Sequence, residues 1–273
     1  MTLPRRTALY MLTVGLVVLF LSPFGWLLIT AFKDPSELRA LPIHWWPHQP
    51  SLDNFRQALT AWPFLGYLRN SLMIASTYAV LITLASAWAG YGFARLAAPG
   101  KKIIFGVLLS TMMMPHVLTL VPTYLLFGKI NLLNSYMPWV LWGLCGAPYL
   151  IFLFRQFFAN MPKELEEAAI VDGCGQISIF WRIFLPQSWP VIATSLILSF
   201  SWNWGDWITP ALLLDDNHTT LAVRLARGYV DQNGQVLSNL VAAGTVMYIL
   251  PVLVLFLIMQ RGFVSGVATS GLK

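Results

Sequence analysis

Six long apolar runs dominate the sequence and restrict what it can fold into. A helix needs about 20 apolar residues to cross the ~30 Å hydrocarbon core of a bilayer. Lipid offers the backbone no hydrogen-bond partners, so each such run must be helical. We therefore predict an all-α integral membrane protein that forms a single transmembrane domain over residues 1–273, with six transmembrane helices near 8–32, 68–94, 103–127, 137–157, 187–214 and 240–260.

The composition and the charge support this class and suggest an orientation. Hydrophobic residues make up 57% of the chain and charged residues only 10%, whereas a soluble domain has about 25% charged residues. The formal net charge of +6 is interpreted as a topology signal and not as nucleic-acid binding, because Lys and Arg concentrate in cytoplasmic loops. Placing both the N-terminus and the C-terminus in the cytoplasm puts more basic residues inside than outside.

A charged insert between the fourth and fifth apolar runs, residues 158–186, interrupts this pattern. Acidic residues between 164 and 167 complement the positive end of a helix that starts near Pro162. Gly173 can end that helix in the left-handed conformation. Residues at three- and four-residue spacing predict a shallow face of mostly small side chains that fits into a groove, and they are Leu165, Ala168, Ala169 and Asp172.

The insert resembles the E-A-A loop of the integral-membrane permeases of ATP-binding-cassette importers, in particular the carbohydrate-uptake, maltose-type family. The family pattern E-A-A-x3-G-x9-I-x-L-P is matched at every defined position, by Glu167, Ala168, Ala169, Gly173, Ile183, Leu185 and Pro186. The resemblance implies that the insert is a short cytoplasmic coupling helix, with Asp172 inside it, that docks on a separate ATPase subunit. The alternative is an ordinary interfacial hairpin, which explains the amphipathic character but not the full spacing.

The same resemblance implies a function, partners and cofactors. The chain is expected to form the translocation pathway for a sugar or related polyol, glycerol phosphate included, in the plasma (inner) membrane of a prokaryote. The expected partners are a second permease subunit, two ATP-binding subunits and an extracytoplasmic substrate-binding protein. ATP and Mg would be bound by the partner ATPase, and no cofactor is expected in this chain.

The fifth apolar run carries a polar stripe that is the candidate for the pathway lining. Asp206 is an ionisable group inside a predicted membrane span, and such a group is costly and functional by default. Trp202 and Trp204 lie near it in the sequence. The alternative is that these side chains serve helix packing and an interfacial aromatic belt. Prolines near His116 and at Pro148 predict broken helices in the third and fourth runs, which are tolerated beside a water-filled cavity. The polar side chains share one helix face, and they are Ser195, Ser199, Asn203 and Asp206.

Two other classes of function fit the sequence less well. A stand-alone secondary transporter would use Asp206 for ion or proton coupling and would show an internal repeat and several buried charges, neither of which is seen. An enzyme is not expected, because no glycine-lysine pair is followed by the Ser or Thr of a nucleotide-binding P-loop. No metal site is expected either, since His44 and His48 have no carboxylate or thiol in the same short run.

Overall fold

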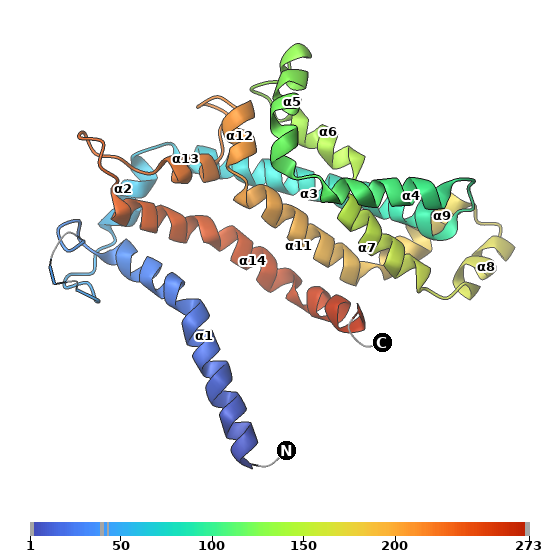
Figure 1. The fold of residues 1–273 in the computed structure, drawn as a ribbon, viewed down its shortest axis with the longest axis horizontal. Coiled ribbons are helices and arrows are strands. Elements are labelled where there is room, and N and C mark those ends of the chain that lie inside the picture. Colours follow the sequence, from blue (N-terminus) through green and yellow to red (C-terminus); the bar gives the residue numbers. More distant parts are fainter. Residues whose placement is uncertain (1–2, 39–40, 43, 271–273) are drawn as a thin grey trace. The chain divides into compact units, whose positions relative to one another are not determined.

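The computed structural model describes residues 3–270 except 39, 40 and 43, and it describes side chains for residues 6–260 with the same exceptions. The regular secondary structure of these residues is helical (Figure 1), which confirms the all-α class. The chain divides into two compact units. Unit 1 contains residues 1–68 and 224–250, and unit 2 contains residues 69–223 and 251–273.

Two long helices belong in part to each unit, α3 (Phe64–Arg95) and α14 (Ser238–Ser270). Unit 1 also contains α1 (Leu3–Phe32) and α2 (Asp53–Thr60), and α13 (Leu221–Arg227) lies where the two units meet in the sequence. The other elements belong to unit 2, and they are α4 (Lys101–Ser110), η1 (Thr111–Met113), α5 (His116–Lys129), α6 (Met137–Cys145), α7 (Pro148–Ala159), α8 (Glu164–Val171), α9 (Gln176–Ile179), η2 (Phe180–Phe184), α10 (Leu185–Gln187), α11 (Trp189–Gly205) and α12 (Ile208–Leu213).

The described residues include enough apolar helix for the six expected membrane crossings. Two of these crossings are bent pairs of helices, 101–113 with 116–129 and 176–187 with 189–205. The number of crossings is six if each pair forms one span. The other four crossings are long helices, and they are Arg6–Phe32, Phe64–Arg95, Met137–Ala159 and Ser238–Gln260.

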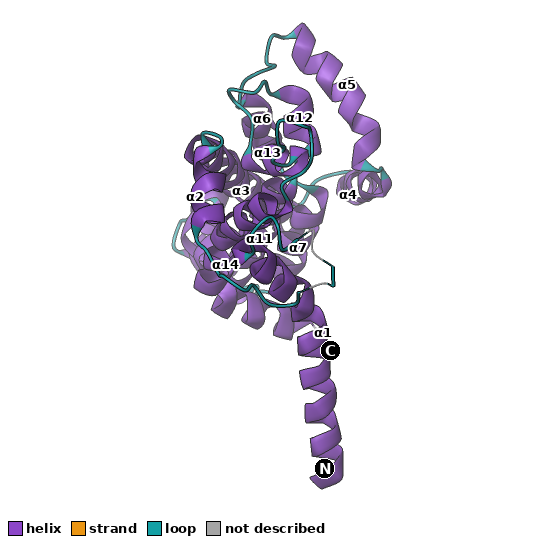
Figure 2. Ribbon diagram, turned by 90° about the vertical axis from the view of Figure 1, so that its left-hand side faces the viewer, coloured by secondary structure: helices purple, strands orange, loops and turns teal. Residues whose placement is uncertain are grey.

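The third span, predicted over residues 103–127 as a helix broken near His116, is indeed interrupted there. The chain bends by 98° between α4 with η1 and α5, and Figure 2 shows α5 leaving α4 at a steep angle. Met114 is extended, with φ −80° and ψ 119°, because the ring of Pro115 disfavours the helical conformation in the residue before it. Pro122 lies inside α5 and does not end it.

The fifth span is also less regular than the continuous helix predicted over residues 187–214. Helix α11 ends at Gly205, Asp206 has an extended ψ of 116°, and α12 starts at Ile208. An 80° bend separates α11 from the short helices that precede it. The 80° bend falls at residue 188, where the predicted fifth run begins, whereas hydropathy gave no sign of the break at Asp206 because the segments on both sides of it are apolar.

The core of unit 1 joins the end of α1 to α2 and to the start of α14. Asn54 is buried, donates from Nδ2 to the carbonyl groups of Ala31 (2.9 Å) and Lys33 (2.8 Å), and accepts a bond from Asn239 (2.7 Å). Trp62 and Tyr229 stack with ring centroids 3.7 Å apart. The two bonds donated by Asn54 satisfy carbonyl groups at the C-terminal end of α1.

The core of unit 2 contains a dense aromatic cluster, which we define as Tyr91, Phe154, Phe158, Phe180 and Phe184. All five side chains are at most 2% exposed. They come from α3, α7 and η2, so they join two long helices to the charged insert. Offset and edge-to-face aromatic pairs each add about 0.5–1.5 kcal/mol beyond the area that they bury.

Candidate functional site

The charged insert contains the helix that the sequence predicted, α8 (Glu164–Val171). Its first turn is acidic, which complements the positive end of the helix dipole. Gly173 has φ +80°. Its N–H donates to Ile170 O (3.0 Å) and the Cys174 N–H donates to Ala169 O (2.9 Å). This is the Schellman pattern that ends a helix at a left-handed glycine, as expected for Gly173.

The small-residue face of α8 is not free, which corrects the sequence prediction. Ala169 is only 5% exposed and packs against the aromatic cluster, while Leu165 is half-buried. Ala168 and Asp172 are exposed on the other side of the helix. Spacing showed that these four residues recur along α8, but it did not show that the aromatic cluster would cover one of them.

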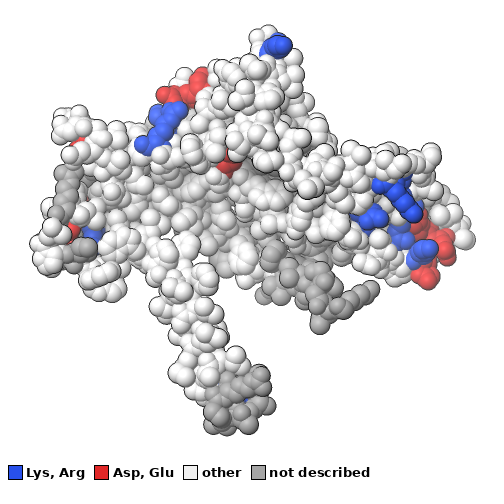
Figure 3. All heavy atoms as spheres, in the orientation of Figure 1, with Lys and Arg blue, Asp and Glu red and all other residues white. Residues whose placement is uncertain are grey.

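The solvent-exposed side of the insert is a mixed acidic and apolar surface, which we call the insert tip. Val171 is 86% exposed, and a Cβ added at Gly173 would meet no atom within 4 Å. In Figure 3, acidic and basic side chains gather over the part of unit 2 that carries α8. The insert tip comprises the exposed residues Glu167, Ala168, Ile170, Val171, Asp172, Gly173 and Ile177.

The second half of the family pattern lies on the packed side of the insert. Ile183 and Leu185 are half-buried against the aromatic cluster, and Pro186 is exposed in α10. Ile183 and Leu185 therefore pack the insert against the aromatic cluster, whereas Pro186, Glu167 and Gly173 are exposed. Of the eight residues predicted for the coupling loop, Ala169, Ile183 and Leu185 are thus buried or half-buried and the others are exposed.

Arg95, at the end of α3, holds the insert beside the aromatic cluster, with its Cζ atom 5.0 Å from the centroid of the Phe184 ring. Its guanidinium donates to Phe158 O (2.7 Å from Nη2) and to Met161 O, and it lies 3.7 Å from the Glu166 carboxylate. The side chains of Arg95 and Glu166 are only 6% and 16% exposed. The planar fork of arginine suits such multiple bonds. The sequence presented Arg95 only as a basic loop residue, because bonds to carbonyl groups leave no mark in a motif.

We predict that Arg95→Met lowers the stability of the protein and loosens the insert, because two carbonyl groups and a poorly exposed carboxylate lose their partner. Breaking a buried ion pair by removing one member costs about 3–5 kcal/mol, and the partial exposure here places the expected loss near ~2 kcal/mol. Thermal unfolding of the detergent-solubilised protein measures it. Arg95→Lys keeps the charge without the fork and should recover only part of the loss. A wild-type melting temperature for Arg95→Met would contradict the role.

The second candidate site is a cavity of about 660 Å³ in unit 2. It opens where α6 gives way to α7, at Gly146, and where α11 gives way to α12, at Asp206. Helices that are broken in this way expose backbone groups that a solute or water can bind. The cavity is lined by Tyr78, Ile82, His116, Thr119, Thr123, Trp139, Trp142, Cys145, Gly146, Ala147, Pro148, Trp202, Asn203, Asp206 and Thr209.

Asp206 shapes the broken end of α11. Its Oδ1 accepts the N–H groups of Ile208 (3.0 Å) and Thr209 (3.1 Å), so the carboxylate caps α12. The Thr209 side chain is 3% exposed, and its hydroxyl has no hydrogen-bond partner among the described residues. An unpaired buried hydroxyl costs about 1–3 kcal/mol, so the break between α11 and α12 carries this cost.

The polar stripe predicted from the sequence divides between packing and cavity. Ser195 and Ser199 are 0% exposed; Ser195 Oγ lies 3.0 Å from Thr83 Oγ1, and Ser199 donates to Ser195 O (2.6 Å). Trp204 is 3% exposed and stacks on Phe200 at 5.3 Å. Ser195, Ser199 and Trp204 are therefore packing residues. Asn203, Asp206 and Trp202 line the cavity, and their place in a translocation pathway stays a prediction.

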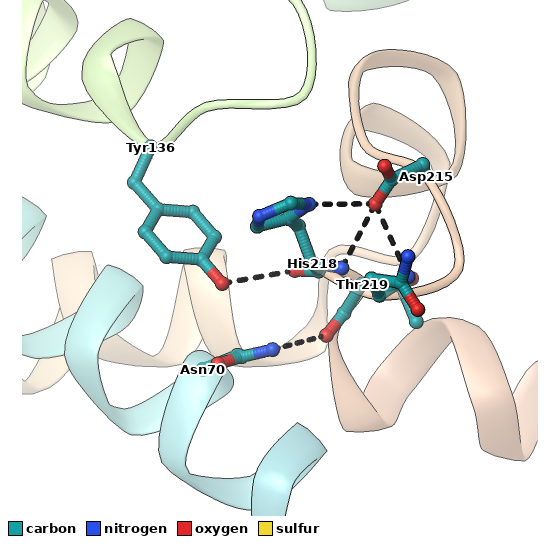
Figure 4. Close-up of polar contacts among 6 residues, drawn as sticks. Asn70, Tyr136, Asp215, His218 and Thr219 are labelled. Carbon is teal, nitrogen blue, oxygen red and sulfur yellow. Dashed lines mark hydrogen bonds and ion pairs between the residues drawn. The ribbon is translucent and has the colours of Figure 1, made fainter.

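The loop after α12 is fastened by the polar contacts of Figure 4. Asp215 Oδ1 accepts bonds from the backbone (2.9 Å) and the ring (2.7 Å) of His218, and these bonds hold the pKa of its carboxyl below the usual value. Tyr136 donates to His218 O (3.3 Å), and Asn70 donates to Thr219 O (3.1 Å). The loop is thereby tied to α3 and to the residue before α6.

Comparison with known proteins decides the family. Residues 82–264 match the family model described as "Binding-protein-dependent transport system inner membrane component". The chain belongs to this family. It is thus a multi-pass inner-membrane permease component of the ATP-binding-cassette type, which confirms the family and function class predicted from the sequence over the secondary-transporter alternative.

Relatives of this permease cover nearly its whole length. The sulfoquinovosyl glycerol transport system permease protein SmoH of Agrobacterium fabrum is 33% identical over 94% of this chain and 90% of its own. The arabinooligosaccharides transport system permease protein AraQ of Halalkalibacterium halodurans is 31% identical over 97% and 96%. A crystal structure of a bacterial ABC transporter involved in the import of the acidic polysaccharide alginate has the same fold, with a TM-score of 0.82, 17% identity and coverage of 96% and 98%.

Proposed function

We propose that this permease lines the path of a sugar or related polyol through the membrane and couples that path to a separate ATPase. It works with a second permease subunit, two ATP-binding subunits and an extracytoplasmic substrate-binding protein. ATP and Mg are bound by the ATPase, and the permease itself holds no cofactor. The observation that carries the proposal is that unit 2 contains both a solvent-exposed insert tip and a cavity lined in part by polar side chains.

The insert tip has the chemistry of a docking surface. Exposed apolar side chains next to acidic groups lie on a helix whose opposite face is fixed by the aromatic cluster and by Arg95. A docked partner would therefore push on a firmly held element and not on a loose loop. Closure of the ATPase subunits would move α8 as a rigid body and shift the side to which the cavity opens.

The cavity has the chemistry of a carbohydrate path. Indole and phenol rings supply apolar faces, and hydroxyl, amide and carboxylate groups supply hydrogen bonds. The relatives leave the charge of the solute open, since arabinooligosaccharides are uncharged and a sulfoquinovosyl group carries a sulfonate.

Single cysteines test the path. In a permease that lacks Cys145 and Cys174, we expect a cysteine at Asn203 to react with a small water-soluble thiol reagent, at a rate that changes when ATP is trapped on the complex. A cysteine at Ser199, four residues away and 0% exposed, is the matched control and should stay unreactive. If Asn203→Cys stays unreactive in every state, the cavity is not a path.

The native cysteine of the insert tests the orientation. With Cys145 removed, we expect Cys174 to react with a membrane-impermeant thiol reagent in inside-out vesicles and not in intact spheroplasts. Cys174 is half-buried beside the insert tip, so reaction after detergent treatment serves as the positive control. Labelling in intact spheroplasts would place the insert, and with it both termini, on the outside.

A further inference from the structure

The lining of the cavity is unbalanced in charge. Asp206 is its acidic side chain, and no Lys or Arg is among its lining residues. The two hydrogen bonds of Asp206 both go to Oδ1, while Oδ2 has no partner among the described residues. The ion pairs that the structure describes involve Arg95 with Glu166 and His218 with Asp215, so neither neutralises Asp206.

The apolar walls of the cavity strengthen the electric field of the Asp206 carboxylate. Trp139, Trp142, Trp202 and Ile82 place apolar groups around the same space. A charge in a cleft with low-dielectric walls is screened less than one on an open surface, and the cleft focuses its field on whatever enters. An anionic solute would meet this field without a compensating cation from the described lining, whereas an uncharged or cationic solute would not be repelled.

We propose that Asp206 is a charge filter in this cavity, so that the solute that passes is uncharged or cationic and phosphate- or sulfonate-bearing solutes are disfavoured. The inference rests on the proposed function, because it needs the cavity to be the path. It assigns Asp206 a task beyond capping α12. Asparagine at the same position offers an oxygen to the same two N–H groups, so the capping task and the charge task can be separated.

Cys145 is a native probe for this filter, because it lies in the lining of the same cavity. The experiment uses the assembled transporter with Cys174→Ser and compares two methanethiosulfonate reagents of similar size, one with a trimethylammonium group and one with a sulfonate group. Each rate is divided by the rate of that reagent with a free thiol in solution. The ratio of the two corrected rates reports the field at Cys145, because the reactivity of the thiol itself cancels.

We expect the cationic reagent to be favoured about tenfold or more, and Asp206→Asn to bring the ratio close to one; tenfold corresponds to about 1.4 kcal/mol. Asp215→Asn is the matched control, since Asp215 Oδ1 also caps backbone N–H groups but lies outside the cavity lining. It should leave the ratio unchanged. His116→Gln, which removes the imidazole of the lining, should leave the preference for the cationic reagent in place.

The outcomes separate the filter from the path. A ratio near one in the wild type, or a ratio that Asp206→Asn leaves unchanged, overturns the filter while the reaction of Cys145 still supports the path. If neither Cys145 nor a cysteine at Asn203 reacts with either reagent in any state, the proposed path is wrong and the filter falls with it.

Discussion

Replacing Gly173 by aspartate is expected to abolish solute uptake while leaving the permease folded in the membrane. Gly173 has φ +80°, where a side chain adds about 1–2 kcal/mol of backbone strain. The larger effect is at the surface, because the new side chain would project into open space on the insert tip. A misfit there should lower uptake and solute-stimulated ATP hydrolysis by well over tenfold, since about 1.4 kcal/mol of lost docking energy already gives a factor of ten.

Gly100→Asp is the matched control for Gly173→Asp. Gly100 has φ +73°, and a Cβ there would also meet no atom within 4 Å, but the residue lies between α3 and α4 and outside the insert tip. Gly100→Asp should therefore reproduce the strain and keep most of the uptake. Glu167→Leu, also on the tip, should reduce uptake like Gly173→Asp. Normal uptake by both insert variants would remove the insert tip from the mechanism.

Gly90→Leu is expected to prevent folding of unit 2. A Cβ at Gly90 would lie 2.6 Å from Phe154 Cβ, 3.0 Å from Arg155 N and 3.1 Å from Ile151 O. Two of these atoms belong to the backbone of α7 and the third is a Cβ, so no side-chain rotation makes room. Overpacking costs about 1–3 kcal/mol where a core can adjust, and we expect at least the upper end of that range here.

The fraction of monodisperse protein after detergent extraction, and its melting temperature, measure the effect of Gly90→Leu. Gly92→Leu is the control on the same helix, because a Cβ at Gly92 would meet no atom within 4 Å. It should behave almost like the wild type. Equal melting temperatures for the two variants would show that the contact between α3 and α7 is not tight.

The helices could be predicted from the sequence, but the way they break could be predicted only in part. Apolar length marks a membrane span whatever its partners are, so the sequence indicates the apolar helices, and the structure contains six crossings if each of the two bent pairs is one span. Pro115 marked a weak point in the third span, yet a proline sets only the local conformation and not the 98° bend. Gly205 and Asp206 are residue types that end and cap helices, but apolar length alone gave no sign of the break at this point.

The candidate site was predicted as sets of residues that share a helix face, and the structure shows the limit of that reasoning. Spacing placed Ser199 and Asn203 on one stripe, but burial changes along a helix, so one packs against its neighbours and the other lines a cavity. Spacing also cannot say which side of α8 is covered, and Ala169 lies on the covered side. Thr209 and Arg95 were missed because tertiary contacts define their roles.

Helix α3 gives Arg95 a mechanical significance that its hydrogen bonds alone do not. Tyr78, in the cavity wall, and Arg95, at the insert, lie on the same helix, and at about 1.5 Å per residue they are roughly 26 Å apart along its axis. No proline interrupts α3 between them, whereas the spans that contain α5 and α11 are broken. A displacement of the insert can therefore be transmitted along α3 to the cavity wall, and a flexible break introduced into α3 between Tyr78 and Arg95 would reduce that transmission.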